Sequence, residues 1–220
     1  MKKDNKTDQN TDIRTPFSEF VRKFKKQKTA VAASIVLLLI VLIAIFADLV
    51  APYGINDYNY SEMLQGPSAK HLFGTDEFGR DIFSRIVYGA RISLAIGFGA
   101  VSLAAILGAI LGLISGYYGG IVDSIIMRVC DVLFAFPGLI LAIAIVAILG
   151  PGLYNVVIAV IVFRTPTFAR LVRGTTLQMK DSVYVQAARS LGASDARLLF
   201  THILPSALPS VIVQYSISIG

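Results

Sequence analysis

Long apolar stretches alternate with polar connectors along the 220 residues of this chain. The stretch 29–50 is long enough to cross a hydrocarbon layer of ~30 Å as a helix. Two further stretches, 92–122 and 132–163, contain no charged residue, and Gly-Pro-Gly at 150–152 divides the second one. The pattern therefore predicts four membrane-spanning helices. They are 29–50, one within 92–122, one from Ser124 or Val132 to Leu149 with a kink at Pro137, and one over 153–169.

The last apolar stretch follows Pro205 and Pro209 and reaches the end of the printed sequence. It is shorter than the ~20 residues that a helical span requires. We therefore expect a fifth span that the chain enters and does not complete.

The positive charge of the connectors predicts the orientation of the chain. Lys and Arg outnumber Asp and Glu by nine to four in the tail 1–28 and by six to two over 164–202, whereas the connector 51–91 carries four against five. Because Lys and Arg gather on the cytoplasmic side of a membrane, the tail and 164–202 are predicted to be cytoplasmic and 51–91 to face outward. Four intervening spans agree with this, and the chain is predicted to be a multi-pass inner-membrane protein with a cytoplasmic N-terminus.

Composition excludes several classes of protein. With 55% hydrophobic and 15% charged residues, much of the surface must face lipid. The single cysteine, Cys130, excludes an internal disulfide and a cysteine-based metal site. The sequence lacks the phosphate-binding loop of ATPases and any Ser/His/Asp cluster, and we expect no catalytic site, bound cofactor or nucleic-acid partner. His71 is expected to be a polar surface residue, whereas His202 faces a partner or fixes a loop.

Two local patterns predict helix packing. In the outward connector, Thr75 is a plausible N-cap for a surface helix whose apolar face would carry Phe78, Ile82, Ile86 and Ala90. Glycines recur at strict four-residue steps farther along, which favours the close approach of a second helix, although glycine is also common in membrane helices. These packing glycines are Gly108, Gly112, Gly116 and Gly120.

The cytoplasmic connector contains a predicted helical hairpin. Asp181 and Ser182 can begin a first helix, and Gly192 is suited to end it because glycine enters the left-handed conformation freely. We expect its apolar side to carry Tyr184, Ala187, Ala188 and Leu191. Ser194 and Asp195 can begin a second helix, which has an apolar stripe of Ala196, Leu199, Phe200 and Ile203 and is expected to end at Pro205. The hairpin either packs on the helices of its own chain or docks on a soluble partner.

Three motifs resemble one family of membrane proteins. "VQAARSLGASDARLLFTHILPSALPSVIV" is similar to the cytoplasmic loop of ABC importer permeases, and "HLFGTDEFGRDIFSRIVYGARISL" and "FARLVRG" resemble the second permease of the dipeptide, oligopeptide and nickel importers. The resemblance runs from about residue 29 to the end. It implies an all-α polytopic bundle, the transmembrane domain of a type I ABC importer, over 92–220, with a coupling loop at 170–205. It also implies a sixth span and a cytoplasmic C-terminus beyond the residues given.

The resemblance assigns the coupling loop to a cytoplasmic ATPase. Its motif positions are Gln186, Ala187, Ala188, Gly192, Asp195, His202, Leu204 and Pro205. Gln186 stands where the family usually has Glu, which puts a salt bridge at that point in doubt. The implied partners are a second permease subunit, two ATPase subunits that bind ATP, an extracellular solute-binding protein and the lipid membrane.

The resemblance implies a pathway for di- and oligopeptides, and the alternative is nickel or another small solute. Ser93, Ser102, Ser115 and Asn155 could line this pathway or serve helix packing. Two functions of other classes are an ion-coupled secondary transporter and a membrane scaffold that transports nothing. The charge-free stretches argue against ion coupling, which usually needs an ionisable group within the membrane.

Overall fold

The computed structural model describes residues 22–219, and the predicted basic tail lies mostly outside them. The chain forms two compact units, Met1–Arg91 and Ile92–Gly220. The first contains α2 (Lys28–Ile45), α3 (Ala47–Val50), the 3-10 turn η1 (Tyr60–Glu62) and the beginning of α4 (Ile82–Tyr118). Helices and loops make up the described part, and its one β pairing is the bridge between Thr75 and Asp81.

The predicted surface helix beginning at Thr75 is wrong. The Thr75 hydroxyl instead donates to the carbonyl oxygen of Glu62 at 2.5 Å and accepts from the backbone N–H of Gln65 at 2.9 Å. Asp81 is the residue that caps the N-terminus of α4, because its Oδ2 accepts from the backbone N–H of Ser84 at 2.7 Å. The surface helix and the span are therefore one continuous helix, α4, which begins at Ile82.

His71 is buried, which contradicts its expected place on the surface. Only 3% of the residue is exposed. Its Nδ1 lies 2.9 Å from Oδ1 of Asp81, its Nε2 lies 3.4 Å from Oε2 of Glu62, and its ring stacks on that of Tyr53. Burial is tolerated because both ring nitrogens have partners. His71 thus joins the loop, η1 and the beginning of α4.

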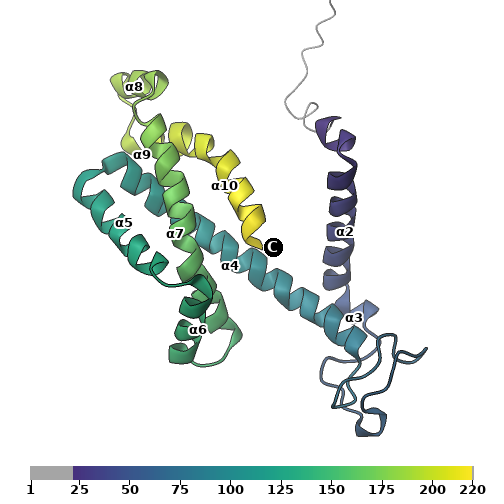
Figure 1. Ribbon diagram of the computed structural model, residues 1–220. Helices are drawn as coiled ribbons and strands as arrows, with labels where there is room; N and C mark the ends of the chain where they lie inside the picture. Colours follow the sequence, from purple (N-terminus) through teal and green to yellow (C-terminus); the bar gives the residue numbers. More distant parts are fainter. Residues whose placement is uncertain (1–21, 220) are drawn as a thin grey trace, which may run out of the picture. The chain divides into compact units, whose positions relative to one another are not determined.

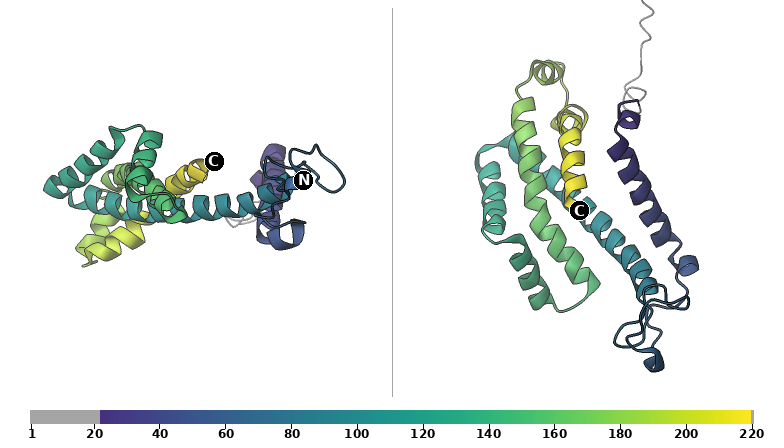
Figure 2. Two further views of the ribbon diagram at one scale, coloured as in Figure 1. Left: turned by 90° about the horizontal axis from the view of Figure 1, so that it is seen from below. Right: turned by 45° about the vertical axis from the view of Figure 1, so that its right-hand side comes forward.

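The second unit is a bundle arranged around α7 (Leu153–Met179). Figures 1 and 2 show α5 (Gly120–Phe134) and α6 (Gly138–Leu149) on one side of α7, and α10 (Leu204–Ile219) on the other. The short helices α8 (Val183–Ser190) and α9 (Asp195–Arg197) and the π-helix η2 (Leu198–Ile203) connect α7 to α10. A buried cluster from α4, α7, α8, η2 and α10 holds this end of the bundle together; it comprises Leu113, Val172, Val185, Leu198, Leu199, Ile203 and Ala207.

Within residues 22–219, four helices are long and apolar enough to cross a membrane: Lys28–Ile45, Ile82–Tyr118, Leu153–Met179 and the continuous Asp195–Ile219. The pair α5 and α6 also meets this criterion, but its axes differ by 90°. The predicted kink at Pro137 is therefore a complete break. Proline has no N–H to continue the helical ladder, and α6 begins after it.

Helical structure continues through Pro205, which was expected to end it. In η2 the turns are wide, and the N–H of Leu204 bonds to the carbonyl of Leu199, five residues back. This widened turn leaves room for the ring of Pro205, which would clash with a carbonyl in a regular α-helix. The second arm of the hairpin and the last apolar stretch therefore form one continuous helical segment of 25 residues, Asp195–Ile219.

Three of the four packing glycines lie against α7. A Cβ atom at Gly108 would be 2.5 Å from Cβ of Phe168, one at Gly112 2.5 Å from the carbonyl oxygen of Ala169, and one at Gly116 2.7 Å from Cβ of Thr176. Gly120 does not belong to this row, because α4 ends at Tyr118 and Gly120 begins α5 with φ of +56°. The row therefore stops where α4 stops.

Replacing Gly112 with alanine should destabilise the bundle. Two of the atoms that the new methyl group would meet are backbone atoms of α7, so the helices must separate. We expect a loss of about 1–3 kcal/mol, typical of overpacking, measured as a lower Tm of the purified protein in detergent. The control is Gly99→Ala in the same helix, where nothing lies within 4 Å of the new Cβ. Equal Tm values for the two variants would contradict close packing at Gly112.

The connector 51–91 should lose stability in acid. Burial raises the pKa of Asp81, but hydrogen bonds from the backbone N–H of Ser84 and from His71 outweigh burial and hold the pKa below its usual value. A depressed pKa stabilises the fold above the pKa of the unfolded chain, about 4, and this contribution disappears as pH falls through the folded value.

This contribution can be isolated by comparing wild type with Asp81→Asn. We expect a higher Tm for the wild type at pH 7 and a difference that shrinks as pH falls below about 4. A difference that stays constant from pH 7 to pH 3 would show that the ionised carboxylate contributes nothing.

Candidate functional site

The first arm of the helical hairpin and the turn after it form where they were predicted, whereas the second arm continues past Pro205. Helix α8 begins after Ser182, whose carbonyl accepts from the N–H groups of Val185 and Gln186. It ends before Gly192, which has φ of +85°. The hydroxyl of Ser194 then accepts from the N–H of Arg197 and caps the second arm. The local capping residues therefore determine the turn between the two arms.

The buried face of α8 differs from the predicted one. Val185 and Ala188 turn toward the core, where Val185 is fully buried beside Leu198 and Ile203. In the second arm the predicted stripe is confirmed in part, since Leu199 and Ile203 are buried, whereas Phe200 is 57% exposed and Leu198 is buried instead. The π-helical turns change the angle between successive side chains, so a stripe spaced for an α-helix matches only in part.

The opposite face of α8 is exposed and apolar. Val183, Ala187 and Leu191 follow one another at four-residue steps; Val183 is 85% exposed and Leu191 89% exposed. We call these three residues the α8 row. The hairpin thus packs on its own chain through one face, as one of the two interpretations expects, and leaves another face exposed.

The other residues predicted to belong to the coupling loop lie around the α8 row or support it. The side-chain amide of Gln186 is exposed and donates to the carbonyl of Asp181 at 3.0 Å. The carbonyl of His202 accepts from the hydroxyl of Tyr184 at 3.3 Å, so the backbone of η2 holds α8. Asp195 begins α9, whereas Leu204 and Pro205 lie at the beginning of α10.

An ion pair near the hairpin escaped the sequence analysis. Arg173 of α7 donates from Nε and a terminal nitrogen to the two carboxylate oxygens of Asp123 in α5, both at 2.5 Å, and the hydroxyl of Ser115 in α4 donates to the same carboxylate. A second pair joins Arg170 to Asp131 at 2.6 Å. These partners lie about 40–50 residues apart, so local periodicity gives no sign of them.

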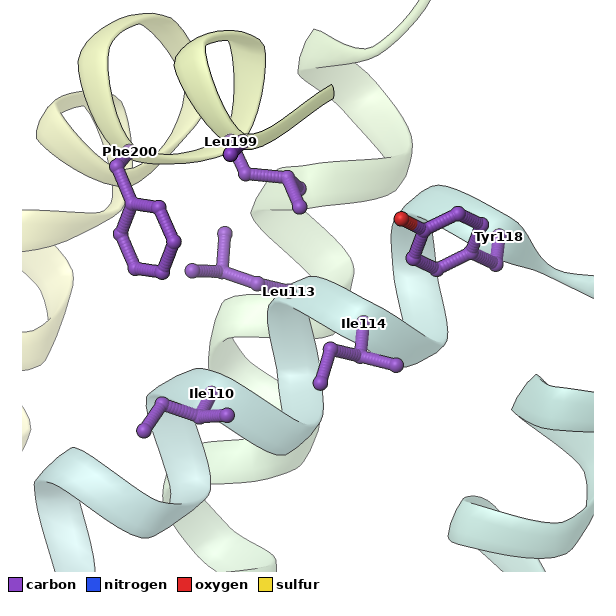
Figure 3. Close-up of a pocket in the computed structure, with 7 residues that line it drawn as sticks. Ile110, Leu113, Ile114, Tyr118, Leu199 and Phe200 are labelled. Atoms are coloured by element: carbon purple, nitrogen blue, oxygen red, sulfur yellow. The ribbon is translucent and has the colours of Figure 1, made fainter. Parts of the chain in front are cut away.

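An apolar cavity of about 280 Å³ lies between α4 and η2, beside the buried cluster in which the two elements meet. Figure 3 shows Leu199 and Phe200 of η2 pointing toward Leu113 of α4, with Ile110, Ile114 and Tyr118 along the same helix. Within residues 22–219, no group of three side chains is arranged to hold a metal ion.

Three of the candidate pathway residues engage in contacts between or at the ends of helices. The Ser102 hydroxyl bonds to that of Tyr215 in α10 at 2.8 Å, and the Asn155 amide donates to the carbonyls of Leu149 and Gly150. Ser115 is bonded to Asp123, as described above. The packing interpretation therefore has direct support for these three residues.

Comparison with known families decides the identity of the chain. Residues 108–220, which include the hairpin, match the family described as binding-protein-dependent transport system inner membrane component. Residues 15–67 match the N-terminal transmembrane domain of oligopeptide transport permease C. The chain belongs to the binding-protein-dependent permease family.

Close relatives place this permease within one branch of the family. It is 52% identical over 209 residues to proteins named glutathione transport system permease protein GsiD from Escherichia coli O6:K15:H31 and from Shigella boydii serotype 4. The same identity holds for the protein of that name from Escherichia coli O157:H7. The alignment covers 94% of this chain and 69% of each relative.

These relationships establish the fold class and the kind of protein. The chain is a permease of the peptide and nickel branch of ABC importers, a multi-pass inner-membrane protein with the all-α transmembrane domain of type I importers. The secondary transporter and the scaffold find no support in these relatives. The exposed hairpin lies within the matched family region.

Replacing Gly192 with alanine should weaken the turn of the hairpin. An alanine in the left-handed conformation costs about 1–2 kcal/mol, although nothing lies within 4 Å of its Cβ. We expect trypsin to cleave faster after Arg189 and Arg197, which flank the turn. The matched control, Gly174→Ala, also has open space but lies within α7, and its cleavage should equal that of the wild type. Equal rates in both variants would show that the turn does not depend on Gly192.

Proposed function

We propose that this permease forms, together with a second permease subunit, the translocation pathway of an ATP-driven importer of di- and oligopeptides. Two cytoplasmic ATPase subunits bind and hydrolyse ATP, and an extracellular solute-binding protein delivers the substrate. The chain itself holds no cofactor and carries no catalytic residue. Its own contribution is the pathway and the surface that receives movement from the ATPase.

The observation that carries this proposal is the exposed α8 row. A leucine that is 89% exposed contributes no burial energy to its own fold, whereas burying such a side chain in a partner stabilises the complex by about 1.5–3 kcal/mol. The other face of α8 is packed against the core, so the row is held rigidly. A rigid apolar ridge on a short helix fits a groove on a soluble subunit.

Gln186 makes this docking surface less charged than its counterpart in the family. Its amide cannot form the salt bridge that a Glu could offer, and the structure bonds it to the carbonyl of Asp181. Attachment to the ATPase therefore depends mainly on the α8 row. The basic side chains on either side supply polar contacts at its edge.

The orientation follows from the charge of the connectors. The hairpin must lie on the side of the ATPase, and the excess of Lys and Arg over 164–202 favours the cytoplasm. The N-terminus would lie on the same side, since its tail carries the same excess. The connector that contains His71 would then face outward, where the solute-binding protein arrives.

Transport would follow from a shift between two arrangements of the bundle. Closure of the ATPase pair on ATP moves its grooves, and the hairpins that occupy them move as rigid bodies. A change of this kind requires the ATPase to bind one arrangement of the permease more tightly than the other. The α8 row is the contact through which that difference in binding is exerted.

The relatives favour a peptide as substrate. Proteins that are 52% identical to this chain are named for glutathione transport, and glutathione is itself a small peptide. The N-terminal family is named for an oligopeptide permease. Nickel or another small solute remains the alternative within the same branch.

The proposal can be tested with the assembled transporter and one matched pair of variants. Leu191→Asp places a charge in the α8 row, and we expect loss of ATPase co-purification and of ATP-dependent uptake of labelled glutathione and dipeptides. Leu64→Asp makes the same change at a leucine that is 74% exposed in the outward connector, and both properties should be retained.

Several outcomes would contradict the proposal. Retention of the ATPase subunits by Leu191→Asp would exclude the α8 row as the docking surface. Uptake of labelled nickel without uptake of either peptide would replace the substrate assignment while leaving the docking assignment intact. Uptake that persists without the ATPase subunits would exclude an ATP-driven importer.

A further inference from the structure

The last turn of α4 touches both arms of the hairpin through one side chain, Tyr117. Its hydroxyl donates to Oδ1 of Asp195 in the second arm at 2.5 Å and accepts from a terminal nitrogen of Arg189 in the first arm at 3.2 Å. The guanidinium carbon of Arg189 also lies 5.6 Å from the centre of the Tyr117 ring. One hydroxyl therefore joins α4, α8 and α9.

The ring of Tyr117 is anchored as well as its hydroxyl. It packs against the buried cluster that contains Val185 of α8 and Leu198 of η2, so its body is held while its polar end reaches the hairpin. Both hydrogen bonds involve a charged partner, and such bonds are shorter and stronger than those between neutral groups. The contact is therefore directional, unlike the apolar packing beneath it.

The two residues before Tyr117 connect the same turn to other helices. Ser115 donates to Asp123 of α5, and Gly116 lies against Thr176 and the carbonyl of Arg173 in α7. Three successive residues of α4 thus contact α5, α7 and the hairpin. A displacement of the hairpin that is transmitted through Tyr117 reaches a turn to which two other helices are attached.

We propose that Tyr117 is a positioning residue that transmits the movement of the hairpin to α4. This inference depends on the proposed function, because it concerns how the movement imposed at the α8 row reaches the spans. The apolar core keeps the hairpin attached to the bundle. The hydrogen bonds of Tyr117 fix the orientation of the two arms relative to α4.

The test compares Tyr117→Phe with Tyr118→Phe in the complete transporter. The first variant removes both hydrogen bonds and keeps the ring. The second removes the adjacent hydroxyl, on a tyrosine that is 56% exposed, so it controls for the loss of a tyrosine hydroxyl at this helix end. Three quantities are measured for each: ATPase co-purification, ATP hydrolysis, and substrate taken up per ATP hydrolysed.

We expect Tyr117→Phe to retain the ATPase subunits and to hydrolyse ATP. Uptake per ATP hydrolysed should fall by at least about fivefold, which is the lower end of a typical coupling between sites. Tyr118→Phe should match the wild type in all three. A purely structural role would lower the amount of assembled complex and leave uptake per ATP unchanged.

A second variant tests the same bond from its other side. Asp195→Ala removes the acceptor of the Tyr117 hydroxyl and should lower uptake per ATP in the same way. In the double variant the two losses should not add, since each single change already breaks the bond. Fully additive losses would overturn the proposal.

The outcomes separate this inference from the proposed function. Unchanged uptake per ATP in Tyr117→Phe, with ATPase bound, would overturn the role of Tyr117 and leave the importer assignment intact. Loss of the ATPase from Tyr117→Phe would show that Tyr117 maintains the docking surface and does not transmit movement. A wild type that binds no ATPase would instead defeat the proposed function.

Discussion

The close approach of α4 to α7 is the constraint on which the second unit depends. At Gly108, Gly112 and Gly116 the surface of α4 has no side chain, and the backbone and Cβ atoms of α7 occupy that space. In lipid there is little hydrophobic force to bring helices together, so such contact supplies much of the association. Because α7 also contacts α5, α6 and α10, its position against α4 determines where the other helices lie.

The close approach of α4 to α7 also positions the polar contacts at this end of the bundle. Gly112 lies against the backbone of Arg173, and one turn later Gly116 lies against Thr176. Arg173 is thereby held where its guanidinium meets Asp123, and that carboxylate also receives Ser115 from α4. An ion pair of this kind is costly to bury unless its geometry is good and its remaining hydrogen-bonding groups have partners. A wider spacing of α4 and α7 would therefore draw Ser115 away from the carboxylate of Asp123, which Arg173 of α7 holds.

Local signals in the sequence predicted the parts of the fold that are determined locally. The stretches without charge located the helices, and Gly-Pro-Gly separated α6 from α7. Gly192 and Ser194 gave the turn of the hairpin because capping depends on residues close in sequence. The sequence did not identify which face of α8 is buried, since the choice between Val185 and Leu191 is made by a core assembled from α4, α7 and η2.

Other failures have the same origin in contacts that are distant in sequence. His71 was expected on the surface because histidine is polar, yet Asp81, Glu62 and Tyr53 combine to bury it. Thr75 has the chemistry of an N-cap, but its hydroxyl is occupied by η1, and Asp81 takes that role. The π-helical turns of η2 shifted the predicted stripe, and a period of 3.6 residues cannot anticipate them.

The two-sided packing of α8 explains why a helix of eight residues can serve as a mechanical contact. A helix this short has little stability of its own in water, so an isolated hairpin would yield when a partner displaced it. Here one face is fixed by Val185, and the turn is fixed by Gly192 and by the bonds of Arg189 and Asp195 to Tyr117. The α8 row therefore projects from a structure that resists deformation, and under the proposed mechanism a displacement imposed there would pass to α4 with little loss within the hairpin itself.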